Sequence, residues 1–119
     1  MKPKRSLAVF GLCFFLVMGL PWDVGAFNEE DLRRLRTTKE CVKCDLSKVN
    51  LVDADLTGSD LSGSNLTEAD LMGANLTKAN LRWTRLTEAN LTEANLIGTS
   101  LNRAILTKAI LTKAKLSSA

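Results

Sequence analysis

Leucine recurs at every fifth position through most of this 119-residue chain. Fifteen leucines follow one another at this spacing, and a small residue, most often Ala, stands two positions before each of them. Asp or Asn directly precedes ten of the fifteen leucines, and Ser or Thr directly follows ten. The leucines of this series are Leu46, Leu51, Leu56, Leu61, Leu66, Leu71, Leu76, Leu81, Leu86, Leu91, Leu96, Leu101, Leu106, Leu111 and Leu116.

A period of five fits neither a single helix nor a single strand. On an α-helix, successive leucines would lie roughly 140° apart around the axis and form no common face. On one flat strand, an odd spacing places successive leucines on opposite faces. A chain that turns a corner every five residues can point every leucine toward a common axis, so the pattern predicts a solenoid.

The repeated units resemble those of the pentapeptide repeat family, as in Ala54–Gly58, Ala74–Lys78 and Ala89–Glu93. The resemblance covers residues 44–118 and implies an all-β solenoid, a right-handed quadrilateral β-helix with four pentapeptides per coil. It also implies that the leucine and the small residue before it point inward. Fifteen units then give about 3.75 coils and a rod about 18 Å long at the usual spacing of hydrogen-bonded strands.

Different residue types are expected at the inward and outward positions of the repeat. Each buried leucine is expected to contribute on the order of 1.5–3 kcal/mol, and the column of alanines indicates an axis with no room for larger side chains. Asp and Asn before the leucines favour turns, because their side chains bond nearby backbone groups.

Residues 1–26 have the three parts of a secretory signal peptide. A basic start is followed by an uncharged stretch over residues 7–20, and small residues lead to a cleavage site predicted after Ala26. An uncleaved membrane anchor is the alternative, but the uncharged stretch reaches only about 21 Å across a hydrocarbon core of roughly 30 Å. We therefore expect export, to a periplasm or a thylakoid lumen, with no membrane attachment after cleavage.

Residues 27–43 are predicted to form an N-terminal capping helix and a linker. Asn28 followed by three acidic residues is typical of a helix start, and the helix is expected over residues 29–37. Laid over the first coil, it would cover the end of the solenoid. This lead-in resembles that of exported cyanobacterial members of the family, which mostly lack an assigned activity. The ion pairs expected at i,i+4 are Glu29 with Arg33 and Glu30 with Arg34.

Cys41 and Cys44 form a CxxC motif between the helix and the first coil. Three roles are open to it: a structural disulfide, a thioredoxin-like redox pair, or part of a metal site. No βαβ pattern surrounds the motif, which weighs against the redox role. A lone CxxC supplies only half of a four-ligand zinc site. The pattern favours a disulfide that pins the helix to the first coil, with no metal expected.

Arg82, Trp83 and Arg85 interrupt the repeat pattern together. In a coil of twenty residues, Arg103 lies one coil beyond Trp83, so we expect a cation–π stack between them. An exposed Trp ringed by Arg resembles a protein-contact hot spot. These four residues are the candidate partner patch, and a tolerated surface ladder is the alternative.

The last units differ from the others. Ile105 and Ile110 replace the outward Asp or Asn, and Leu111 and Leu116 have no further repeat above them. These four residues are a candidate C-terminal interface. The resemblance implies a homodimer through this coil as one option, because the repeat family includes end-to-end dimers, and a frayed end is the other.

The chemistry of the chain argues against catalysis. It contains no His, the commonest general base and metal ligand, and it shows no nucleophile–base pair or cofactor motif. The net charge is +3, of which +2 belongs to residues 1–26, and acids interrupt the basic positions, so no nucleic-acid partner is expected. The sequence predicts an exported, non-catalytic structural or protein-interaction scaffold with an unknown protein partner and no cofactor. The alternative is a thiol-responsive binding module that uses Cys41 and Cys44.

Overall fold

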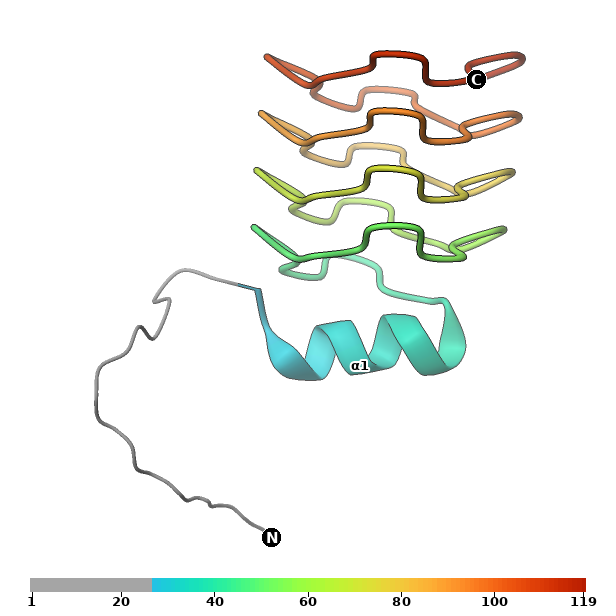
Figure 1. The fold of residues 1–119 in the computed structure, drawn as a ribbon. Coiled ribbons are helices and arrows are strands. Elements are labelled where there is room, and N and C mark those ends of the chain that lie inside the picture. Colours follow the sequence, from blue (N-terminus) through green and yellow to red (C-terminus); the bar gives the residue numbers. More distant parts are fainter. Residues whose placement is uncertain (1–26) are drawn as a thin grey trace, which may run out of the picture.

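The computed structural model describes residues 27–119, so the predicted signal peptide and its cleavage site lie outside the described residues. One helix, α1 (Glu29–Thr38), leads into a stack of coils (Figure 1). The helix lies across one end of the stack, and the C-terminus lies at the other end. The sequence indicates a helix over residues 29–37, and α1 continues for one residue more.

The coils are joined by short parallel bridges rather than by long strands. Each bridge pairs a residue with the one twenty positions later, from Glu40 with Asp60 to Asn95 with Lys115. One coil is therefore four units of five residues. Main-chain bonds connect the coils, as when Leu76 N–H donates to the Asn95 carbonyl at 2.7 Å. The chain winds as a quadrilateral β-helix.

A tight turn forms each corner of a coil. The carbonyl of every leucine in the series accepts the N–H three residues later, as Leu76 does from Ala79 at 2.9 Å. The residue two after the leucine has a positive φ, which is typical of a type II turn. Some units have glycine at this position, such as Gly73. Other units have a residue with a side chain, and Lys78 and Trp83 adopt the same conformation with φ of 60° and 64°. A side chain at this position stands on the outside of the corner.

The interior holds the leucines and the small residues before them, as the sequence predicts. From Leu46 to Leu96, every leucine of the series is at most 4% exposed, and Ala79 is 1% exposed. In the last coil Leu101 and Leu106 are only partly buried. The β-helix is therefore filled along its axis and leaves no channel for a ligand.

Polar residues in the inward column bond to the coil beneath them. Thr84 Oγ1 donates to the Leu61 carbonyl, 23 residues earlier, at 2.9 Å, and Thr99 makes the equivalent bond. Ser59 is equally buried, but the residue 23 positions before it is Arg36, which belongs to α1 and interrupts the register. Among the described side chains, Ser59 Oγ is the one buried polar atom without a hydrogen-bond partner.

Asp and Asn before the leucines hold the turns, which confirms that prediction. Asp55 Oδ1 accepts the Thr57 N–H at 3.1 Å and its hydroxyl at 2.7 Å. Asn90 makes the same pair of bonds to Thr92. Each such carboxylate or amide thus satisfies a backbone donor at the start of a corner.

The helix α1 packs against the first coil. Asn28 Oδ1 accepts the Asp31 N–H at 3.0 Å and caps the helix start. Leu32 and Leu35 face the coil and are 9% and 0% exposed. Lys39 ends the helix in the left-handed conformation, and its N–H bonds the Leu35 carbonyl.

The ion pairs predicted on α1 are wrong in their spacing. The structure pairs Arg33 with Glu30 and Arg34 with Asp31, each at i,i+3 instead of i,i+4. The reason lies in Asp31, whose other carboxylate oxygen accepts the Asp45 N–H at 2.9 Å. That bond holds the Asp31 carboxylate between the helix and the first coil, where Arg34 reaches it.

Candidate interaction surface

Trp83 is the most exposed large apolar residue that the structure describes, at 54%. It occupies the positive-φ position of its turn, so its indole stands outside the corner. The Arg103 guanidinium carbon lies 4.7 Å from the centroid of the indole ring, within cation–π range. The predicted stack between these two residues is therefore present.

The other two members of the predicted patch lie beside this stack. Arg82 and Arg85 are exposed and belong to the same stretch of coil as Trp83. Among the described residues, none of Arg82, Arg85 and Arg103 forms an ion pair with a carboxylate, whereas Lys48 at another corner pairs with Glu68 at 4.0 Å. The patch thus combines an exposed indole with three guanidinium groups free to meet an anion.

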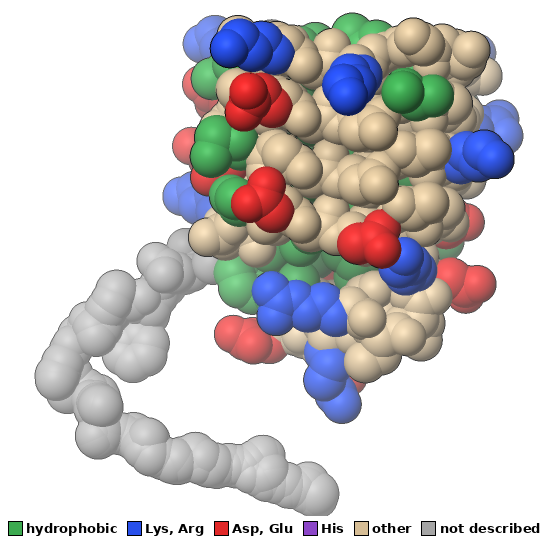
Figure 2. Space-filling view, turned by 45° about the vertical axis from the view of Figure 1, so that its right-hand side comes forward, with side chains coloured by type: hydrophobic (Ala, Val, Ile, Leu, Met, Phe, Trp, Pro, Cys, Tyr) green, Lys and Arg blue, Asp and Glu red, His purple; other side chains and the backbone are tan. Residues whose placement is uncertain are grey.

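On one side of the stack, charged side chains of both signs are scattered. Figure 2 shows this side, where acidic and basic side chains are spread among neutral atoms. Most of the surface in this view is backbone or uncharged polar side chain, as expected from the Asn, Ser and Thr of the repeat. Cations without an ion-pair partner also occur outside the patch, since among the described residues Lys78, Lys108 and Lys113 form no ion pair either.

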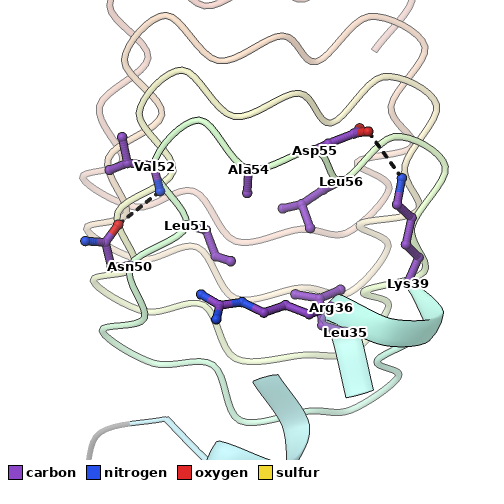
Figure 3. A pocket seen from close by; sticks show the side chains of 9 residues that line it. All are labelled: Leu35, Arg36, Lys39, Asn50, Leu51, Val52, Ala54, Asp55 and Leu56. Atoms are coloured by element: carbon purple, nitrogen blue, oxygen red, sulfur yellow. Dashed lines mark hydrogen bonds and ion pairs between the residues drawn. The ribbon is translucent and has the colours of Figure 1, made fainter. Parts of the chain in front are cut away.

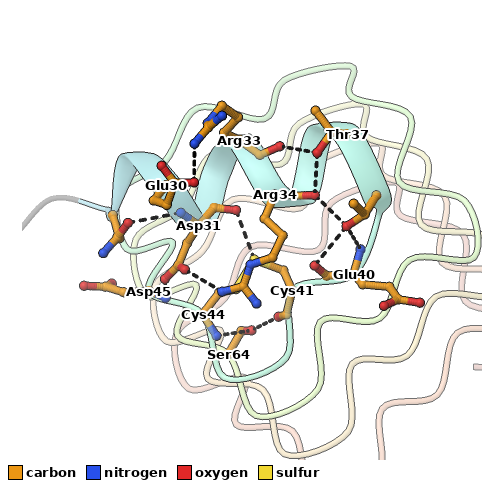
Figure 4. A network of polar contacts seen from close by, with 12 residues as sticks. Glu30, Asp31, Arg33, Arg34, Thr37, Glu40, Cys41, Cys44, Asp45 and Ser64 are labelled. Carbon is orange, nitrogen blue, oxygen red and sulfur yellow. Dashed lines mark hydrogen bonds and ion pairs between the residues drawn. A yellow bond between two sulfur atoms is a disulfide. The ribbon is translucent and has the colours of Figure 1, made fainter. Parts of the chain in front are cut away.

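Cys41 and Cys44 form the predicted disulfide, with an S–S distance of 2.02 Å. Both residues are buried, at 0% and 2% exposed, between α1 and the first coil (Figure 4). Ser64 in the next coil donates to the Cys41 carbonyl at 2.6 Å and accepts the Cys44 N–H at 2.9 Å. The CxxC segment is thus fixed covalently and by a buried hydroxyl.

Asp31 is the third potential metal ligand beside the two cysteines. Its carboxylate and both sulfurs lie within 4.8 Å of one another. The two sulfurs are bonded to each other, and the carboxylate is bound to Arg34 and to the Asp45 N–H. In the disulfide form these residues hold the helix to the coil and offer no thiolate to a cation.

Replacing Cys41 and Cys44 by Ala is expected to destabilise the chain by about 2 kcal/mol, because the disulfide closes only a short loop. The measurement is urea unfolding followed by circular dichroism. Wild-type protein treated with dithiothreitol is the control and should lose about the same free energy. An unchanged unfolding midpoint in the double variant would contradict a stabilising role for the bond.

A hollow of about 320 Å³ lies between the end of α1 and the first coil (Figure 3). Leu51, Ala54 and Leu56 form its apolar part, and the Arg36 side chain extends from the helix across it. Lys39 Nζ lies 3.6 Å from Asp55 Oδ2 at the rim. No nucleophile–base pair is found among the residues that line the hollow. The full lining is Leu35, Arg36, Lys39, Asn50, Leu51, Val52, Ala54, Asp55 and Leu56.

At this rim the pKa of Asp55 is lowered from its ordinary value. The Thr57 hydroxyl and N–H are the main cause, since both donate to the carboxylate, and the charge of Lys39 adds to it. A lowered pKa in the folded state means that ionised Asp55 stabilises the fold at neutral pH. The contribution is lost as the pH falls through the pKa of the folded state.

Thr57→Val is therefore expected to raise the pKa of Asp55 toward its ordinary value, because it removes the hydroxyl bond. Lys39→Gln should raise it by less. A carboxyl-carbon NMR titration of the three proteins measures both shifts. Equal pKa values in the wild type and Thr57→Val would show that the hydroxyl does not stabilise the carboxylate.

The candidate C-terminal interface is exposed. Ile105, Ile110 and Leu116 are 47%, 49% and 45% exposed, and Leu111 is partly buried. Ile105 and Ile110 occupy the position that Asp or Asn holds in most units, whereas Leu111 and Leu116 belong to the leucine series. The homodimer through this coil stays a prediction.

Within residues 27–119 no helix is both long and apolar enough to cross a membrane.

Comparison with known proteins shows the family. The profile described as pentapeptide repeats matches residues 50–87 and 84–119. The chain belongs to the pentapeptide repeat family, and its fold is the right-handed quadrilateral β-helix that the repeat implies. Pentapeptide repeat proteins are generally structural repeat proteins and not enzymes.

Three solved structures illustrate the likeness. A pentapeptide repeat protein from the cyanobacterium Cyanothece is 23% identical, with 72% of this chain and 97% of that chain covered and a TM-score of 0.42. One from the thylakoid lumen of Arabidopsis thaliana is 26% identical, covering 70% and 62%, with a TM-score of 0.49. One from Nostoc is 30% identical, covering 72% and 77%, with a TM-score of 0.43. No curated protein sequence matches the chain significantly.

Proposed function

We propose that this protein is an exported, non-catalytic scaffold that presents a protein-binding patch on a rigid β-helix. The observation that carries the proposal is Trp83, which is 54% exposed and stacked by Arg103 at 4.7 Å. An indole this exposed loses contact with water only when a partner covers it, and Trp and Arg are the residues that contribute most at protein interfaces.

The rest of the molecule is suited to support such a patch. The leucines are committed to the core, and the turns are held by side-chain bonds such as that between Asp55 and Thr57. Trp83 and Arg103 are therefore held in fixed relative positions, and little conformational entropy is lost when a partner binds them.

Export is supported by two independent features. Residues 1–26 have the pattern of a signal peptide, and the Cys41–Cys44 disulfide is of a kind that persists in oxidising compartments. We place the protein in a periplasm or a thylakoid lumen. N-terminal sequencing of the exported protein should find Phe27 first, and a chain that still begins at Met1 would contradict cleavage.

The thiol-responsive module is the less favoured function. A redox-active pair needs at least one sulfur that a partner thiol can attack. Cys41 and Cys44 are 0% and 2% exposed and lie beneath α1, so attack would require the helix to lift. The burial favours a structural bond.

Affinity purification from the exported fraction tests the scaffold proposal. Wild type, Trp83→Ala and Met72→Ala would be compared, since Met72 is another apolar side chain exposed at a corner, at 39%. Proteins retained by the wild type and by Met72→Ala should be lost with Trp83→Ala. The same set of proteins on all three baits would show that the patch is not the binding site.

A further inference from the structure

One corner of the β-helix carries basic side chains and no acidic ones. The turn residues stacked at this corner, twenty apart along the chain, are Val42 and Lys43, Ser62 and Gly63, Arg82 and Trp83, and Asn102 and Arg103. We call this column the basic corner. Within the part of the chain that the structure describes, none of the three basic residues of this corner forms an ion pair; they are Lys43, Arg82 and Arg103.

The next corner along the chain carries acidic side chains in its two middle coils. Glu68 and Glu88 occupy the positive-φ positions there, between Lys48 below and Lys108 above. Glu40 and Asp60 form a column on the face that precedes the basic corner, so the corner is a narrow stripe with acidic side chains on both flanks. A broad polyanion such as a nucleic-acid duplex would meet these carboxylates, whereas a single extended chain would fit between them.

We propose that the basic corner binds an extended acidic segment of a protein, an inference that rests on the proposed scaffold function and names the chemistry of its partner. Carboxylates suit the free guanidinium groups, because a planar carboxylate accepts two parallel hydrogen bonds from one Arg. The exposed indole of Trp83 adds a site for an apolar side chain of the same segment.

The dimensions of the corner agree with a short peptide. Coils repeat at about 4.8 Å, so Lys43 and Arg103 lie roughly 14 Å apart along the axis, the length of about four residues of an extended chain. Arg82 and Trp83 stand between them, one coil before Arg103. Gly63 has no side chain, and the stem of Lys43 lies over it, since a Cβ at Gly63 would meet Lys43 Cγ at 3.2 Å.

A random peptide library displayed on phage tests the partner chemistry without presuming a sequence. The full chain as exported is the bait, and the variant Arg82→Gln/Trp83→Ala/Arg103→Gln removes peptides that bind elsewhere. We expect the enriched peptides to be rich in Asp and Glu around one apolar residue. Enrichment of neutral or basic peptides, or no enrichment over the variant, would overturn the proposal.

Calorimetry with the enriched peptide then identifies the residues. Arg103→Gln and Trp83→Ala should each weaken binding by about tenfold or more. Lys108→Gln is the matched control, because Lys108 is exposed in the same coil as Arg103 but at the next corner; it should weaken binding by less than about twofold. Equal losses for Arg103→Gln and Lys108→Gln would mean that only net charge matters, and would overturn the site.

Further experiments test the chemistry of the bound segment separately from the proposed scaffold function. A peptide with Gln and Asn in place of Glu and Asp should lose about tenfold or more in affinity. Heparin oligosaccharides or single-stranded DNA that bind the corner more tightly than any enriched peptide would replace the acidic segment as occupant. If Trp83→Ala abolishes partner capture in the exported fraction while no acidic peptide is enriched, the scaffold function stands and this inference fails.

Discussion

Leu76→Ala is expected to lower the free energy of unfolding by about 3 kcal/mol. Leu76 is 0% exposed and lies in the middle of the stack, with leucines of other coils above and below it. Removing its side chain leaves a cavity on an axis that hydrogen bonds hold at fixed spacing, so the coils have little freedom to close it. Chemical denaturation followed by circular dichroism measures the loss.

Leu116→Ala is the matched control for this substitution. Leu116 stands at the same position of its unit but is 45% exposed, so much of its surface already faces water. Its replacement should cost less than about 1 kcal/mol. Similar losses at Leu76 and Leu116 would show that position along the axis does not determine how much a leucine contributes.

The regular part of the fold could be predicted because it depends on local spacing. A leucine every five residues predicts a chain that turns a corner every five residues, and the resemblance to the pentapeptide repeat family implies the four corners that make a coil of twenty residues. The stack of Arg103 on Trp83 was predictable for the same reason, since the register alone places them in neighbouring coils.

The capping helix and the disulfide at the end of the solenoid were predicted, but the contacts of α1 with the first coil could not be, because they depend on how the helix sits on that coil. That seating places Asp31 against Arg34 and the Asp45 N–H, in place of the expected pairs. It also opens the hollow beside Arg36 and leaves Ser59 Oγ without an acceptor. These are contacts between a helix and a coil, and neither the helical period nor the period of five carries information about them.

The candidate site divides in the same way. Arg82, Trp83 and Arg85 stand out in the sequence because they break the repeat, and Arg103 is found from the twenty-residue register. Whether a carboxylate reaches these arginines depends on which residues stack at each corner. Glu68 and Glu88 lie at a neighbouring corner, where Glu68 pairs with Lys48. The sequence has an excess of acids before these units, so composition alone does not reveal an unpaired basic stripe.

Ala79→Leu is expected to lower the free energy of unfolding by up to about 3 kcal/mol. The cause is overpacking of the core, whereas Leu76→Ala acts by leaving a cavity. Ala79 is 1% exposed and lies in the inward column, where its N–H bonds the Leu76 carbonyl at 2.9 Å. A larger side chain must displace the leucines of its own coil or lengthen the bonds between coils. Urea unfolding again measures the effect.

Ala109→Leu tests whether confinement is the cause. Ala109 belongs to the same inward column but is only partly buried in the last coil. A leucine there can turn toward solvent, and its added apolar surface can cover Leu106, so the loss should be below about 1 kcal/mol. If Ala79→Leu left stability unchanged, the axis would have to be wider than the column of small residues implies. The small residues before the leucines would then be explained by the geometry of the turns and not by a narrow core.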